Sequence, residues 1–105
     1  QIVRLPTGIA IALPSPEYVA LVFARSGLGI RHGVALANGV GVIDSDYRGE
    51  IQVGLINQSD VPYTVQPGER IAQLAVLPVV QARLSAVSEL DETSRGTGGF
   101  GSTGK

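Results

Sequence analysis

The sequence has no cysteine, methionine or tryptophan, and its 105 residues include two phenylalanines and three tyrosines. The lack of cysteine excludes disulfides and thiolate metal sites and leaves the redox compartment open. Eight basic and nine acidic residues give a net charge of −1, which argues against the broad basic face that a nucleic-acid backbone requires. No apolar run approaches the roughly 20 residues of a membrane-spanning helix. No targeting signal is seen, so we predict a cytoplasmic protein.

The residues that are abundant favour short strands. The apolar fraction of 44% is mostly Val, Ile, Leu and Ala, and fourteen glycines and six prolines divide it at short intervals. This pattern is typical of an all-β protein, and a barrel or jelly roll fits better than a sandwich of long strands. No segment has a long helical period, and residues 82–90 have only a weak one. The strand-like segments are residues 7–13, 17–24, 34–37, 40–43, 50–57, 61–65 and 70–80.

The predicted turns organise these segments. Residues 14–16 (Pro-Ser-Pro) and 66–69 (Gln-Pro-Gly-Glu) are turn sequences. Residues 38–52 resemble a β-hairpin with its polar tip near Ser45, which would place Gln52 opposite Asn38. We expect a β-barrel core over residues 1–90 and a flexible tail over residues 91–105.

The tail combines glycines and hydroxyl groups with Arg95 and Phe100. Glycine lets backbone N–H groups crowd an anion, a guanidinium binds phosphate in a fixed fork, and an aromatic ring can stack on a base. A frayed polar terminus is the ordinary alternative. The composition therefore predicts either an unstructured end or a segment that closes over a ligand.

Four stretches of the chain match one known family. They are residues 24–28 (ARSGL), 38–50 (ending in GVIDSDYRGE), 67–74 (PGERIAQL) and 95–104 (RGTGGFGSTG). In this order and spacing they resemble motifs two to five of the homotrimeric dUTP diphosphatase (dUTPase) family. The family's first motif, an Ala-Gly-x-Asp-Leu-like stretch on an upstream strand, is absent from this chain. We therefore expect that an N-terminal segment with its strands is missing here, or that the chain is a truncated relative.

The resemblance implies a role for particular residues. Asp44 would be the general base that activates a water for attack at the α-phosphorus of dUTP. The uracil and the sugar would contact Asn38, Val42, Ile43, Tyr47, Gln52 and Phe100. The phosphates would contact Arg25, Ser26, Gly27, Gln73, Arg95, Gly98, Gly99, Ser102 and Thr103. No residue would bind metal directly, because Mg²⁺ would be held through the phosphates and water.

The chemistry of these side chains suits their implied roles, although each has an ordinary explanation as well. A Tyr47 ring under the sugar would leave no room for a 2′-hydroxyl, and the Asn38 amide can pair with the uracil edge. Alternatively, Asp44 and Asn38 are turn residues and Tyr47 is a half-buried strand residue. Strand alternation predicts that Gln73 is buried, so that its amide needs a partner.

Two other residues have predicted roles that do not involve substrate contact. His32 has no carboxylate or second histidine at a ligand spacing, so we predict a surface or interface residue. We predict that Arg70 braces the site or the tail.

The function that the resemblance implies is magnesium-dependent hydrolysis of dUTP to dUMP and pyrophosphate in a homotrimer with shared active sites. It would keep uracil out of DNA and supply dUMP for thymidylate synthesis. The alternative is a non-catalytic trimeric module that binds a nucleotide or a protein. A dCTP deaminase is a third hypothesis, which Tyr47 and the tail with Phe100 disfavour.

Overall fold

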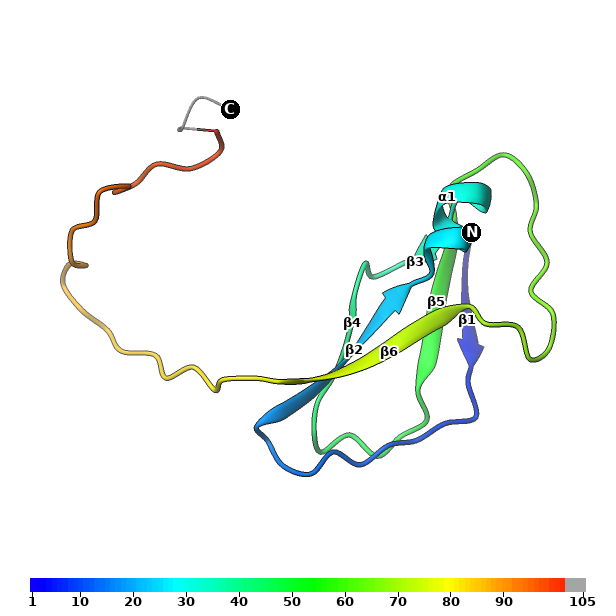
Figure 1. Cartoon of the computed structure of the whole chain (residues 1–105), viewed down its shortest axis with the longest axis horizontal. Coiled ribbons are helices and arrows are strands. Elements are labelled where there is room, and N and C mark those ends of the chain that lie inside the picture. Colours follow the sequence, from blue (N-terminus) through cyan, green and yellow to red (C-terminus); the bar gives the residue numbers. More distant parts are fainter. Residues whose placement is uncertain (102–105) are drawn as a thin grey trace.

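The computed structural model describes residues 1–101 of the chain. Within that range it contains six strands and one short helix, shown in Figure 1. The elements are β1 (Ile2–Pro6), β2 (Tyr18–Ala24), α1 (Ser26–His32), β3 (Val34–Leu36), β4 (Gly41–Ile43), β5 (Gln52–Asn57) and β6 (Ala72–Pro78). The all-β prediction is confirmed, and most of the strand-like segments become strands.

The strands form two antiparallel three-stranded sheets. One sheet has the order β1-β5-β3, and the other has the order β4-β2-β6. The predicted β-hairpin over residues 38–52 is therefore wrong, because β4 pairs with β2 while β5 pairs with β1 and β3. Gln52 is opposite Pro6 rather than Asn38. The chain between β4 and β5 crosses from one sheet to the other.

Residues 7–9 explain why β4 and β5 separate. The Ile51 N–H donates to the carbonyl of Ile9 at 2.8 Å, and the Gly8 N–H donates to the Glu50 carboxylate at 2.7 Å. Gly8 has a φ of 74°, a left-handed conformation that interrupts an extended strand. The predicted strand over residues 7–13 is therefore wrong, and residues 7–9 instead hold the backbone that precedes β5.

The helix α1 was not predicted, because seven residues show no helical period. It begins after Arg25 and ends at Gly33, whose φ of 69° and two backbone hydrogen bonds form a left-handed C-cap. Leu28 is its buried residue. Residues 61–65 form no strand, while the predicted turn at residues 66–69 is confirmed by a hydrogen bond from the Glu69 N–H to the Gln66 carbonyl.

The core is small and aliphatic. Alternate residues of β2 and β5 point inward and pack with residues of β3, β4 and α1, as period-two patterning predicts. The buried residues are Ala20, Val22, Leu28, Val34, Leu36, Ile43, Ile51, Val53 and Leu55. By contrast, Leu74 and Val76 of β6 pair with Val22 and Ala20, yet remain 43% and 47% exposed. The apolar side chains on the core-facing side of β6 are therefore only partly covered by the core.

The chain leaves the sheets after β6. The Val79 N–H donates to the Glu17 carbonyl at 2.8 Å, and the Gln81 side-chain amide donates to the Pro16 carbonyl at 2.9 Å. Residues 82–97 are exposed and contain no helix, so the weak helical prediction over 82–90 is wrong. Figure 1 shows this segment curving away from both sheets. The division into a core and a tail at residue 90 stays a prediction.

Candidate functional site

A cavity of about 160 Å³ lies where β2, β4 and the start of β5 meet. Its lining includes five residues that the sequence associates with the base and the sugar: Asn38, Val42, Ile43, Tyr47 and Gln52. Although Asn38 and Gln52 are not strand partners, the crossing of the chain between the sheets brings both to one cavity. Val22, Leu36 and Val53 supply part of its apolar wall. Such a cavity, whose lining combines aliphatic side chains with polar groups, suits a small planar ligand.

Asp44 directly follows β4 and is exposed, next to Ile43 in the cavity wall. Its carbonyl accepts a hydrogen bond from the Tyr47 N–H at 3.1 Å, which closes a turn. The turn fixes the backbone that carries the carboxylate, and exposure leaves that carboxylate accessible to water. Both the turn-residue explanation and a catalytic role are compatible with this geometry.

The Tyr47 ring lies over Gly49. Its hydroxyl donates to the Glu50 carbonyl at 3.0 Å. A Cβ atom at Gly49 would lie 2.6 Å from Cζ of the ring, closer than real carbon atoms approach. Glycine at this position therefore allows the ring to lie against the turn at the edge of the cavity.

Four of the residues predicted to bind phosphate occupy one end of the sheet β4-β2-β6. Arg25, Ser26 and Gly27 follow β2 directly, and Gln73 pairs with Phe23 near the end of β2. The Gln73 side-chain amide donates to the Ala24 carbonyl at 3.0 Å. The prediction that Gln73 is buried is wrong, because β6 is an edge strand and this residue alternates away from the core.

Arg25 is fixed by the loop that precedes β6. Its Nη1 donates to the carbonyl of Arg70 at 3.0 Å. The prediction that Arg70 braces the site is consistent with this contact, which Arg70 makes through its backbone. A depression of about 230 Å³ beside it is lined by Arg25, Gly27, Leu28, Arg31, His32, Tyr63, Glu69 and Arg70.

Sequence reasoning missed Tyr63 and Glu69 in this depression. The Tyr63 hydroxyl donates to the Glu69 carboxylate, and the Tyr63 ring lies 4.7 Å from the His32 ring at 49°. The hydrogen bond from the Gln66 N–H, followed by that from Tyr63, lowers the pKa of Glu69. The hydrogen bond to Glu69, with partial desolvation, raises the pKa of Tyr63. At neutral pH these shifts favour a charged Glu69 carboxylate as acceptor and a protonated Tyr63 hydroxyl as donor.

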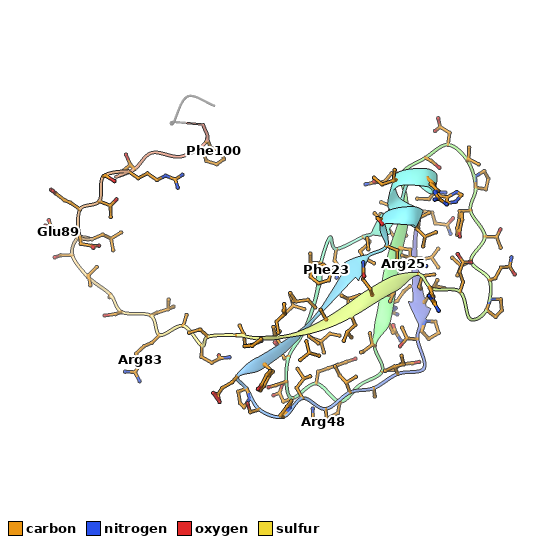
Figure 2. All side chains as sticks on the ribbon, in the orientation of Figure 1. Phe23, Arg25, Arg48, Arg83, Glu89 and Phe100 are labelled. Carbon is orange, nitrogen blue, oxygen red and sulfur yellow. The ribbon has the colours of Figure 1, made fainter. Side chains whose placement is uncertain are left out.

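The tail residues lie apart from both clusters. Figure 2 shows Phe100 at the far end of the extended segment, well away from Arg25. Phe100 is fully exposed, and Arg95 bonds locally, its Nε donating to the Gly98 carbonyl. Gly98 and Gly99 belong to the same local turn region. Ser102 and Thr103 lie outside the described residues.

Residues 1–101 include no group of three histidine, cysteine or carboxylate side chains placed to hold a metal ion. In the same range, no helix combines the length and apolar character needed to cross a membrane.

Comparison with known proteins gives the family. The dUTPase family model matches residues 1–104. A deoxyuridine 5′-triphosphate nucleotidohydrolase of Desulfitobacterium hafniense is 61% identical over 104 residues, which are 99% of this chain and 69% of that protein. The enzyme of the same name from Neisseria meningitidis serogroup A is 57% identical, over 95% of this chain and 67% of its own. The chain belongs to the dUTPase family.

Solved structures agree on the fold. The dUTPase of Streptococcus mutans is 32% identical and superimposes with a TM-score of 0.71, covering 78% of this chain and 68% of its own. A dUTPase of Staphylococcus bacteriophage 80alpha reaches a TM-score of 0.75 over 98% of this chain and 80% of its own, at 22% identity. The two sheets are therefore the β-barrel, jelly-roll type of fold that the sequence predicted.

Proposed function

We propose that this chain hydrolyses dUTP to dUMP and pyrophosphate. The observation that carries the proposal is the cavity in which Asn38, Val42, Ile43, Tyr47 and Gln52 meet beside Asp44. Relatives named deoxyuridine 5′-triphosphate nucleotidohydrolase support it at 57–61% identity. In the cell this reaction keeps uracil out of DNA and supplies dUMP for thymidylate synthesis. The cytoplasmic location remains a prediction.

In this proposal the cavity binds the base and the sugar and determines which nucleoside is accepted. The Asn38 amide donates to a uracil carbonyl and accepts from the ring N–H, while backbone groups of Val42, Ile43 and Gln52 complete the base contacts. The small volume rejects the methyl group of thymine, and mismatched donors reject the amino group of cytosine. The Tyr47 ring lies under the deoxyribose and excludes a 2′-hydroxyl.

Asp44 acts as the general base on the attacking water, and its exposure beside the cavity gives that water access. Arg25, Ser26, Gly27 and Gln73 donate to the phosphates, where the guanidinium and the amide hold the negatively charged oxygens of the bound triphosphate. Arg95 and the glycines of the tail, with Ser102 and Thr103, complete the phosphate contacts. Phe100 stacks on the base as the tail closes and excludes water.

The reaction depends on a divalent metal, which we infer to be Mg²⁺. When bound, Mg²⁺ neutralises charge on the triphosphate. It favours phosphate oxygens and water as ligands. The phosphate-binding residues then orient the nucleotide that carries the metal, while Asp44 activates the water.

We infer that the chain assembles into a homotrimer with shared active sites. Leu74 and Val76 stay 43% and 47% exposed on the core-facing side of β6, which leaves an apolar surface for a second copy. The core consists of nine buried aliphatic residues within residues 1–101, a small number for an independent domain. One chain would supply the cavity and others the phosphate-binding residues or the tail.

Pyrophosphate release from dUTP with Mg²⁺, compared with release from dCTP, dTTP and UTP, tests the proposal. Turnover confined to dUTP supports it. No turnover of dUTP, with the nucleotide still bound, would contradict it and favour the binding module. Molar mass from light scattering, measured on the same sample, tests the trimer.

Gly49→Ala is expected to weaken discrimination against UTP. The new Cβ would lie within 3.0 Å of the Tyr47 ring, so the ring must move away from the turn. Its displacement opens space for a 2′-hydroxyl, and kcat/KM for UTP relative to dUTP should rise roughly tenfold. The measurement is the ratio of the two kcat/KM values. Gly29→Ala, where a Cβ meets only the Val34 carbonyl at 3.8 Å, adds no contact with the ring and should leave the ratio unchanged.

A further inference from the structure

The guanidinium of Arg25 depends on a backbone carbonyl for its orientation. Nη1 donates to the Arg70 carbonyl at 3.0 Å, although the two residues are 45 positions apart. A guanidinium carries five N–H donors, so this bond leaves others free for a phosphate oxygen while it restricts the direction of the side chain. The position of the Arg70 carbonyl therefore decides where Arg25 points.

The Arg70 carbonyl directly follows a turn over residues 66–69, and Glu69 makes two hydrogen bonds across this turn. The Glu69 N–H donates to the Gln66 carbonyl at 3.1 Å, and the Gln66 N–H donates to Glu69 Oε1 at 2.9 Å. Gly68, between them, has a φ of 78°. The Glu69 carboxylate therefore stabilises the turn. The next residue, Arg70, carries the carbonyl that Arg25 contacts.

Tyr63 holds the second oxygen of the same carboxylate. Its hydroxyl donates to Glu69 Oε2, and its ring packs on His32 at the end of α1. The helix α1 begins directly after Arg25 and ends at His32. The residue on which Tyr63 packs is therefore in the segment that starts next to Arg25. The contacts run from α1 through Tyr63 and Glu69 to the Arg70 carbonyl and back to Arg25.

We propose that Tyr63 and Glu69 are positioning residues that aim the Arg25 guanidinium at the phosphates of the nucleotide. Neither side chain touches substrate. Their hydroxyl–carboxylate pair fixes the turn at residues 66–69, and the turn presents the carbonyl that orients Arg25. The proposal rests on the proposed function, because it takes Arg25 as a phosphate-binding residue.

Tyr63→Phe tests the proposal with little change in shape. The variant keeps the ring that packs on His32 and removes only the hydroxyl. We expect the KM for dUTP to rise about fivefold and kcat to stay within about twofold. The reason is that a misaimed Arg25 guanidinium loses about one net hydrogen bond to the phosphates of the bound substrate. Glu69→Gln, which lacks one acceptor oxygen, should raise KM at least as much. Tyr18→Phe, a hydroxyl deletion on β2, should change neither constant.

A double-mutant cycle separates positioning from general stability. In an Arg25→Ala background, Tyr63→Phe should change KM by less than about twofold, because its effect passes through Arg25. A KM effect of Tyr63→Phe that persists without Arg25, or no effect in the native background, would overturn the proposal. Thermal unfolding of all four proteins should show the same stability change for Tyr63→Phe in both backgrounds.

The affinity for inorganic pyrophosphate, measured by calorimetry, reports phosphate binding by Arg25 without requiring turnover. Tyr63→Phe should weaken this binding about fivefold, and only when Arg25 is present. If the native protein fails to hydrolyse dUTP but shows this pattern, the proposed function is wrong and the positioning stands. If dUTP is hydrolysed and the pattern is absent, the positioning alone is wrong.

Discussion

Replacing Asp44 with asparagine is expected to lower kcat for dUTP by about 10²- to 10⁴-fold, the usual contribution of a general base. The amide keeps the size of the side chain and cannot accept the proton of the attacking water. The turn bond from the Tyr47 N–H to the Asp44 carbonyl is a backbone contact, so the fold around the cavity should persist. Affinity for dUTP should therefore stay within about tenfold of the native value.

The measurement is single-turnover pyrophosphate release together with dUTP binding by calorimetry. Asp46→Asn is the matched control, because Asp46 is an exposed carboxylate two residues further along the same loop. It should keep kcat within about twofold, as exposed side chains outside a site usually do. Normal turnover in Asp44→Asn would show that another group activates the water.

Deletion of residues 94–105 is expected to reduce kcat/KM for dUTP by about a hundredfold or more, because closure over the bound nucleotide positions it and excludes water. Assembly should be unaffected. The apolar surface of Leu74 and Val76 on β6 is retained. Within residues 1–101, the last hydrogen bond to the body of the protein, from Gln81 to Pro16, lies upstream of the deletion.

Steady-state kinetics and light scattering on the truncated protein check both parts of this prediction. Glu89→Ala alters the same extended segment outside the deleted residues and should leave kcat/KM unchanged. If the truncated protein retains its rate, the tail does not act as a lid and Phe100 does not stack on the base.

The strands that could be predicted from the sequence are those with a local signal. In β2, β5 and β6 apolar residues are dense or alternate, and turn sequences bound them, so their approximate positions follow from residue type. The failures depend on distant partners. Residues 38–52 look like a hairpin, but residues 7–9 bind Glu50 and Ile51, a pairing about 42 positions apart that local patterns do not encode.

The candidate site was predictable to a similar extent. The run from Gly41 to Glu50 carries the family resemblance, and the cavity does collect Val42, Ile43 and Tyr47. The burial of Gln73 was mispredicted because alternation says nothing about whether a strand lies at a sheet edge. Glu69 lies in the matching stretch of residues 67–74, but nothing in the sequence pairs it with Tyr63, because the importance of that pair comes from contacts with His32 and, through Arg70, with Arg25.

The anchor of the tail at Gln81 has a consequence for how closure depends on concentration. From Gln81 to Phe100 an extended chain spans at most about 68 Å, so the aromatic ring explores a bounded volume around its own assembly. Tethering of this kind produces a local concentration on the order of millimolar. Closure is then independent of how dilute the enzyme is. A free peptide with the sequence of residues 91–105 would have to be supplied at comparable millimolar levels to restore activity to the truncated protein.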